Sequence, residues 1–356
     1  QLGELYAGLN SDNSLNVDAV LQMNIEKTLD NKGVIYAGSV FELEALALNN
    51  TGGNLSFGAS STFNLNGDLV NRDGTISFGG ESGSIVANTI DNREGNLSLA
   101  GTGELELTAQ TALDNTRGVI SAQNTVSLTA ENLDNIEGAI VARDIIINTK
   151  NLDNQSGAID ASQLHISATT LANQDGKLIS RADSERSMTL DVSKHLDNSD
   201  GFIYTAGQIL SINTQQLTNK QGMVSTADDT WLDINIAGNL DNSGGSLQAE
   251  AISINADNLD NAEGTVTASL LDIDAQTVVN NLGYLQAEKV TLAAEQYRSA
   301  GGVLLAFGSS EKALDLNVSR LIENTRQGII QAHSGSLTLK TDAINNSGGI
   351  INLKGR

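Results

Sequence analysis

The side chains in this sequence that could do acid–base chemistry are mainly carboxylates. Glu263 lies close in sequence to Asp241 and Asp260, and such a pair on neighbouring turns of a fold would suit the acid and base roles of glycoside hydrolysis. However, an aspartate stands directly before an asparagine at positions 30, 91, 114, 134, 153, 197, 241 and 260. A carboxylate that recurs in this way is typical of a repeated turn, so we predict no catalytic residue and no enzyme activity in this chain.

The other residues suited to chemistry are few. His165, His195 and His333 lie far apart, and none has a metal-ligand or catalytic-triad partner nearby, so we expect surface histidines. Asp228 and Asp229 are two adjacent carboxylates, too few for a calcium site. There is no cysteine, which excludes disulfides and thiolate chemistry and is compatible with a bacterial protein exported unfolded. We therefore predict no metal and no cofactor.

A repeat runs through the whole sequence. Leu-x-Asn-x-x-Gly-x-Ile (or a close variant) returns every 19 to 25 residues, with Ser299 replacing the asparagine once. The anchor positions are 31, 50, 71, 92, 115, 135, 154, 173, 198, 219, 242, 261, 280, 299, 324 and 346. Because the pattern never lapses and proline is absent, residues 1–356 are predicted to be one continuous repeat structure, an internal fragment of a larger filament.

The periodicity within each repeat predicts strands. Ile159, Ala161, Leu164, Ile166 and Ala168 alternate with mostly polar residues, which is the period of a β-strand. Repeats this short, without hairpin signals, must place each strand beside its equivalent in the next repeat. The prediction is an all-β, right-handed parallel β-helix of about 16–17 coils of 19–25 residues, with aliphatic and small residues inside.

The regular spacing of Asn and Gly from repeat to repeat predicts structural roles for both. Asparagines of successive coils would stack into a ladder whose amides hydrogen-bond to one another. The glycine three residues later is expected to supply a positive φ at a tight corner. Examples of this predicted ladder are Asn135, Asn154 and Asn173 with Gly138, Gly157 and Gly176.

Longer coils differ from the minimal coil at one corner. The extra residues fall after the short run that follows the glycine, at 180–187, 226–230 and 306–312, so the loop-bearing coils are 173–242 and 299–324. Loops on a rigid scaffold are where binding residues tend to lie. The predicted receptor-binding residues are Arg181, Asp183, Glu185, Arg186, Asp228, Asp229, Trp231, Phe307 and Lys312. The alternative is that the loops are tolerated insertions and that Trp231, the only tryptophan, packs inward.

The composition limits the partners. The formal net charge is −23, which disfavours nucleic acid and anionic membranes. No apolar run is long enough to span a membrane, so this segment is not expected to insert into one, and the first ten residues do not resemble a signal peptide.

The motif Leu-Asp-Asn-x-x-Gly-x-Ile, then Ala, then Leu-x-Leu-x-Ala, resembles the haemagglutinin repeats of the filamentous haemagglutinin family along essentially the whole chain. That resemblance implies a two-partner secretion exoprotein of a Gram-negative bacterium, exported through an outer-membrane transporter and found at the cell surface or secreted. Members include adhesins and contact-dependent growth inhibition effectors. The Val-Glu-Asn-Asn element of many effectors is absent, and Ile322-Glu323-Asn324-Thr325 is not assigned its role. Any toxin activity would lie outside this chain.

Three functions are therefore open. The chain could be a passive stalk of an adhesin or toxin-delivery filament. It could also bind a target-cell or host receptor or glycan through its corner loops. The remaining alternative is a polysaccharide-binding or polysaccharide-cleaving β-helix protein. The first two are the functions we expect, and the sequence does not decide between adhesin and growth-inhibition effector, because both use the same coil.

Overall fold

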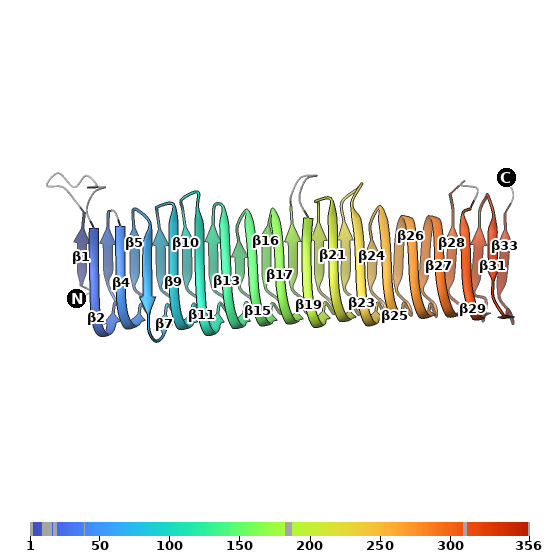
Figure 1. Cartoon of the computed structure of the whole chain (residues 1–356), viewed down its shortest axis with the longest axis horizontal. Helices are drawn as coiled ribbons and strands as arrows, with labels where there is room; N and C mark the ends of the chain where they lie inside the picture. The colour runs from blue at the N-terminus through green and yellow to red at the C-terminus, as the bar shows by residue number, and fades with distance from the viewer. Residues whose placement is uncertain are drawn as a thin grey trace. The chain divides into compact units, whose positions relative to one another are not determined.

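A computed structural model describes residues 3–8, 16, 20–38, 40–181, 187–308 and 312–354, apart from the side chain of residue 187. The described chain is all-β, and its strands stack in parallel into a β-solenoid of about 15 turns, as the sequence predicted. This is slightly fewer turns than the repeat count suggested. By its contacts the chain divides into a first unit, 1–171, and a second unit, 172–356. Within each unit, equivalent strands of successive coils lie side by side (Figure 1).

The first unit contains the first seventeen strands. They are β1 (Glu4–Ala7), β2 (Val20–Asp30), β3 (Val34–Ala37), β4 (Val40–Asn49), β5 (Asn54–Phe57), β6 (Ser61–Leu65), β7 (Leu69–Val70), β8 (Thr75–Phe78), β9 (Ser82–Asp91), β10 (Asn96–Leu99), β11 (Glu104–Asp114), β12 (Val119–Ala122), β13 (Thr125–Asp134), β14 (Ala139–Val141), β15 (Asp144–Asp153), β16 (Ala158–Ala161) and β17 (Gln163–Ala172), whose last residue begins the second unit.

The second unit contains the remaining strands. They are β18 (Lys177–Ser180), β19 (Ser187–Asp197), β20 (Phe202–Thr205), β21 (Ile209–Thr218), β22 (Met223–Thr226), β23 (Trp231–Asp241), β24 (Ser246–Gln248), β25 (Ala251–Asp260), β26 (Thr265–Val279), β27 (Tyr284–Ala300), β28 (Val303–Ala306), β29 (Leu314–Thr325), β30 (Ile329–Ala332), β31 (Leu337–Lys340), β32 (Ala343–Asn345) and β33 (Ile350–Leu353).

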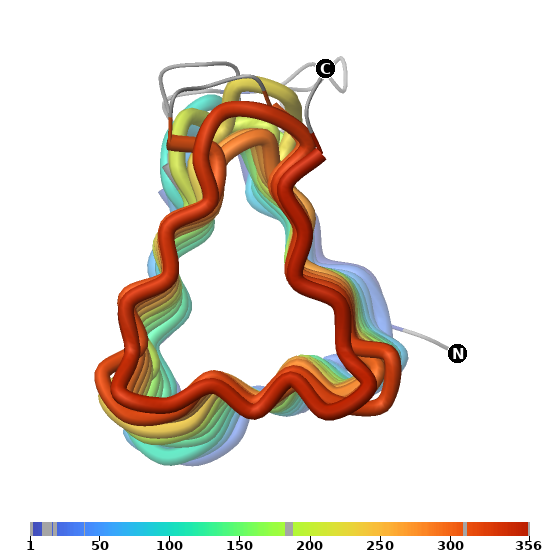
Figure 2. Tube along the Cα trace, turned by 90° about the vertical axis from the view of Figure 1, so that its right-hand side faces the viewer, coloured from blue at the N-terminus to red at the C-terminus, as the bar shows by residue number. Residues whose placement is uncertain are grey.

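Most coils consist of one short and one long strand. The short strands pair only with the equivalent strands of neighbouring coils, as β12 does with β10 and β14. Many long strands show a register shift near their middle, for example between Thr108 and Ala112 of β11, where the pairing is locally irregular. Each coil has three sides around one interior (Figure 2).

The interior is narrow and apolar, as predicted. In one minimal coil, Ile159, Leu164, Ile166 and Leu171 are each at most 1% exposed. The first unit departs from a purely aliphatic interior at Phe41, Phe57, Phe63 and Phe78, all buried. The rings of Phe41 and Phe57 stack at 4.4 Å, and Phe63 meets both edge-on at 5.5 Å. Aromatic pairs in these geometries stabilise beyond the area they bury.

The predicted asparagine ladder is present in both units. In the first unit, each anchor from Asn31 to Asn135 donates its Nδ2 to the Oδ1 of the next anchor at 2.7–2.8 Å, ending at Asn154. In the second unit the same chain runs from Asn173 to Asn280. All these asparagines are buried. Nδ2 of each anchor from Asn31 to Asn261 also donates to the carbonyl of the following glycine, so the side chain fixes the corner.

Our prediction that the motif glycine has a positive φ is wrong for Gly138, Gly157 and Gly176. The positive φ lies one residue earlier, at Glu137 (53°) and Ser156 (54°), and mostly at non-glycine residues in the other coils. The glycine is needed for another reason. A Cβ at Gly157 would lie 2.1 Å from the backbone oxygen of Asn135 and 2.7 Å from Oδ1 of Asn154. It is therefore close approach between coils that excludes a side chain.

Ser299 interrupts the ladder in the second unit. Tyr297 replaces the usual buried leucine two residues before the anchor, and its hydroxyl lies 3.4 Å from Nδ2 of Asn280. The hydroxyl of Ser299 donates to the backbone oxygen of Asn280. Complete burial raises the pKa of Tyr297 to about 12, and the hydrogen bonds to Ser299 and Asn280 only partly oppose this. In the next coil, Oδ1 of Asn324 is buried without a hydrogen-bond donor among the described residues.

Candidate functional site

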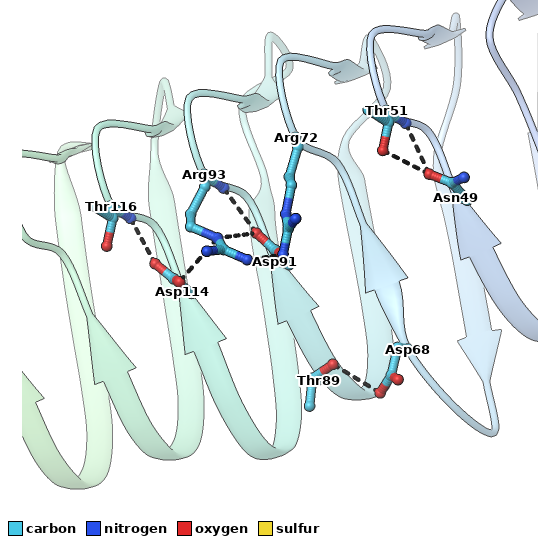
Figure 3. Close-up of polar contacts among 9 residues, drawn as sticks. All are labelled: Asn49, Thr51, Asp68, Arg72, Thr89, Asp91, Arg93, Asp114 and Thr116. Atoms are coloured by element: carbon cyan, nitrogen blue, oxygen red, sulfur yellow. Dashed lines mark hydrogen bonds and ion pairs between the residues drawn. The ribbon is translucent and has the colours of Figure 1, made fainter.

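The aspartate that precedes eight of the anchors closes the outer side of the corner in most of those coils. Oδ1 of Asp114 accepts a hydrogen bond from the backbone N–H of Thr116 at 2.9 Å, and Asn49 does the same for Thr51 (Figure 3). This is the Asx-turn, in which a side-chain oxygen replaces a backbone acceptor. Where a cation is near, the carboxylate also pairs with it: Arg72 and Arg93 both contact Asp91.

Of the carboxylates suggested for acid and base roles, Asp241 and Asp260 have the same structural function, while Glu263 is the corner residue with a positive φ of 58°. Asp260 accepts a hydrogen bond from the backbone N–H of Ala262 at 3.0 Å. Asp241 accepts from the N–H and the hydroxyl of Ser243 and lies 3.1 Å from Nζ of Lys220. Burial alone would raise the pKa of Asp241, but these contacts together lower it. A general acid requires the opposite shift, so Asp241 is unsuited to protonating a leaving group near neutral pH.

Stacking the same aspartate in successive coils has an electrostatic cost in the first unit. Burial, followed by the charges of Asp114 and Asp153, raises the pKa of Asp134. No ion pair joins Asp134 to any described residue. The ionised form of Asp134 therefore destabilises the fold, whereas that of Asp241 stabilises it.

These opposite shifts predict opposite effects of two identical substitutions. At neutral pH, Asp134→Asn should raise the melting temperature, because it removes a penalised charge. This gain should disappear as the pH falls below about 3.9, where the carboxyl is protonated in the unfolded chain as well. Asp241→Asn should lower the melting temperature at neutral pH, and this loss should shrink as the pH falls through the lowered pKa. Thermal unfolding by circular dichroism at several pH values tests both, and equal shifts at every pH would contradict the assignment.

The three histidines lie on different coils. Nε2 of His195 lies 2.9 Å from Oγ1 of Thr218, His165 is half-buried and His333 is exposed. Among the described residues no group of three or more metal-ligating side chains comes together, and no helix could cross a membrane. One open hollow of about 400 Å³ lies on the outer side of the second unit, over Asp257, Asp274 and Glu295.

The corners that the sequence singled out lie between the short strands and the following long strands of the second unit. Because the strands on both sides pair in register from coil to coil, the described ends of these corners stack along the unit. At about 4.8 Å per coil, Arg181 lies about 10 Å from the 227–230 corner, and Phe307 about 19 Å beyond that corner. Asp183, Glu185 and Arg186 lie outside the described residues. The predicted residues that the structure describes therefore share one edge, though not one compact site.

The 227–230 corner is held by hydrogen bonds. The buried hydroxyl of Thr230 donates to the backbone oxygen of Gly207 at 2.7 Å, and the N–H of Trp231 donates to that of Gln208 at 3.1 Å. Asp229 has a positive φ of 62°, so the corner turns sharply. Asp228 and Asp229 are exposed at its tip. The long strand that follows therefore begins at a fixed position.

Trp231 faces outward and is 57% exposed, so the alternative that it packs inward is wrong. The sequence pattern predicts this position. Leu232 and Ile234 are the apolar, buried residues of this strand, and because side chains alternate along a strand, Trp231 lies on the opposite side. Phe307 is 41% exposed, and its N–H donates to the oxygen of Ala287. Arg181 and Lys312 are exposed.

Sequence reasoning missed the outward residues beside Trp231. Register places Ile209 and Ala251 next to it in the preceding and following coils, and Leu270 one coil further. The available signal for Ile209 and Ala251 was that each, like Trp231, is the first residue of a long strand, whereas Leu270 occupies the equivalent position within β26. Comparison of the chain with protein-family models, curated proteins and solved structures finds no match.

Proposed function

We propose that this chain is a stalk segment of a secreted, filament-forming exoprotein at the surface of a Gram-negative bacterium. The observation that carries the proposal is the repeated coil itself, with its buried asparagine ladder. Each coil of about 20 residues adds about 4.8 Å along the axis. Most coils also present the next with the same hydrogen-bonding surface, so the structure can be extended by adding repeats. A β-solenoid is well suited to spanning distance.

The resemblance to haemagglutinin repeats supports the finer part of the proposal. The filament would present an adhesive module or a contact-dependent growth inhibition toxin to another cell, after export by an outer-membrane transporter that recognises a domain outside this chain. The corner loops of the second unit would bind a receptor or glycan on the target cell. The exposed Trp231 and Phe307 support this role, because large apolar side chains at fixed exposed positions favour contact with a partner.

Binding to cells tests the receptor role. The purified protein is compared on bacterial and epithelial cells with a variant whose corners at 181–187, 226–230 and 306–312 are cut to the two-residue corner 162–163. A matched control shortens only the corner at 100–103 of the first unit. We expect saturable binding by the wild type and the control to one class of cells, and loss of binding in the trimmed variant. Circular dichroism must show that all three proteins are folded.

The class of cells bound, and the effect of trimming the corners, distinguish the proposed roles. Binding to bacterial cells supports growth inhibition, and binding to epithelial cells supports host adhesion. If the wild type binds no cells, or if the trimmed variant binds equally well, the receptor role of these loops is wrong, and the stalk role alone is left.

A further inference from the structure

Trp231 belongs to a continuous apolar surface on the outside of the second unit. Ile209, Trp231, Ala251 and Leu270, here called the apolar column, occupy one position in four successive coils. Leu270 is 38% exposed, whereas Ala251 between it and Trp231 is only 8% exposed. Because the small side chain of Ala251 faces outward, its burial indicates that the two larger neighbours cover it. The column is therefore one surface and not a set of isolated residues.

Carboxylates surround the apolar column. Asp228, Asp229 and Glu250 come from the corners before Trp231 and Ala251, and Asp233 and Asp272 lie two residues beyond Trp231 and Leu270 on the same outer side. None of these five carboxylates forms an ion pair with a described residue. One cation is near, since Lys289 follows Leu270 in the next coil. The surface combines apolar contact area with a strong negative potential.

This combination selects a cationic partner with aliphatic side chains. A guanidinium stacks on an indole ring and forms charge-assisted hydrogen bonds with carboxylates. An aliphatic side chain would contact Leu270. The two centres, Trp231 and Leu270, are two coils apart, about 10 Å, which an extended chain covers in three residues. We propose that the apolar column and its carboxylates form a docking surface for a basic protein segment with arginine and leucine three residues apart.

This proposal refines the receptor-binding part of the proposed function, but its test is independent of cells. Trp231 is the only tryptophan in the chain, so intrinsic tryptophan fluorescence reports on this surface alone. The probe is a blocked 12-residue peptide, free of aromatic residues, with arginine and leucine alternating at every third position and serine elsewhere. Two control peptides replace all arginines with glutamate or all leucines with serine.

We expect a saturable change in fluorescence with the arginine–leucine peptide and at least about tenfold weaker binding of each control peptide. Leu270→Ser and the double variant Asp228→Asn/Asp229→Asn should each weaken binding about fivefold or more, and both keep the tryptophan reporter. Tyr284→Ala is the control variant, because Tyr284 is a similarly exposed aromatic residue (49%) on the short-strand side of the unit. It should leave binding unchanged.

Several results would overturn the docking surface. These are no saturable signal, equal binding of the glutamate peptide, or binding that is unaffected by Leu270→Ser. A fluorescence response to maltoheptaose or chitohexaose without a response to the peptide would also overturn it, in favour of a glycan site. If cells are bound but the peptide gives no signal, this inference fails while the proposed function stands. If the peptide binds but no cells are bound, the docking surface is supported and only the adhesive role in the proposed function is wrong.

Discussion

Replacing Gly157 with alanine is expected to destabilise the first unit by about 3 kcal/mol or more. The added Cβ would lie 2.1 Å from the backbone oxygen of Asn135, which is part of the neighbouring coil. Forcing atoms into a packed interior costs about 1–3 kcal/mol. Here the obstacle is backbone, so the coils must separate and the contacts of the asparagine ladder weaken as well. The midpoint of urea unfolding, followed by circular dichroism, measures the loss.

The control for Gly157→Ala is Ser156→Gly, one residue earlier. Ser156 has a positive φ of 54°, which costs an L-residue about 1–2 kcal/mol. Glycine removes this strain but gains entropy in the unfolded chain, so the midpoint should rise slightly or stay the same. If both variants unfolded at the wild-type midpoint, close approach would not be the reason for glycine at position 157.

The second large effect is expected for Asn135→Leu, in the ladder of the first unit. Asn135 accepts from Nδ2 of Asn115 and donates to Oδ1 of Asn154, both at 2.7 Å, and it also reaches the oxygen of Gly138. Leucine has a similar size but leaves Oδ1 of Asn154 without its donor. A buried polar group without a partner costs about 1–3 kcal/mol, and the lost hydrogen bonds add to this, so we expect a loss of about 3 kcal/mol.

Asn151→Leu is the matched control, because Asn151 makes equivalent hydrogen bonds at the surface. Its Nδ2 donates to Asn132 and its Oδ1 accepts from Thr170, each at 2.8 Å, but the residue is exposed. Water can replace these partners, so the change should stay within about 0.5 kcal/mol. Hydrogen–deuterium exchange over residues 131–160 should show faster exchange in Asn135→Leu only. Equal losses in the two variants would contradict the importance of burial.

The fold was predictable because each repeat specifies it independently. Alternation in a coil such as 158–171 identifies the buried side of every strand, and regular spacing of asparagine requires the coils to stack. The role of glycine was not predictable from one coil. The residue with positive φ varies from Ser156 to Glu137 to Leu282, so no residue type marks it, and the oxygen that excludes a Cβ belongs to the neighbouring coil.

The candidate site was predictable only in part. The excess length of some coils located the corners, since insertions in a solenoid must leave the stacked strands undisturbed. Alternation with Leu232 and Ile234 was sufficient to place Trp231 outside. The apolar column was missed because it runs across strands, and its members are separated by 19 to 22 residues in the sequence.

The interruption at Tyr297 and Ser299 has a mechanical consequence. In a solenoid each coil is stabilised chiefly by its two neighbours, so unfolding spreads from coil to coil through their shared contacts. Where the asparagine ladder is unbroken, the contacts between neighbouring coils are alike, and no junction between coils is weaker than the others. The buried Oδ1 of Asn324 marks a junction that lacks one of them. Under tension along the axis, the second unit should therefore open first between the coils of Ser299 and Asn324, so that a filament built from such coils has a defined place to yield.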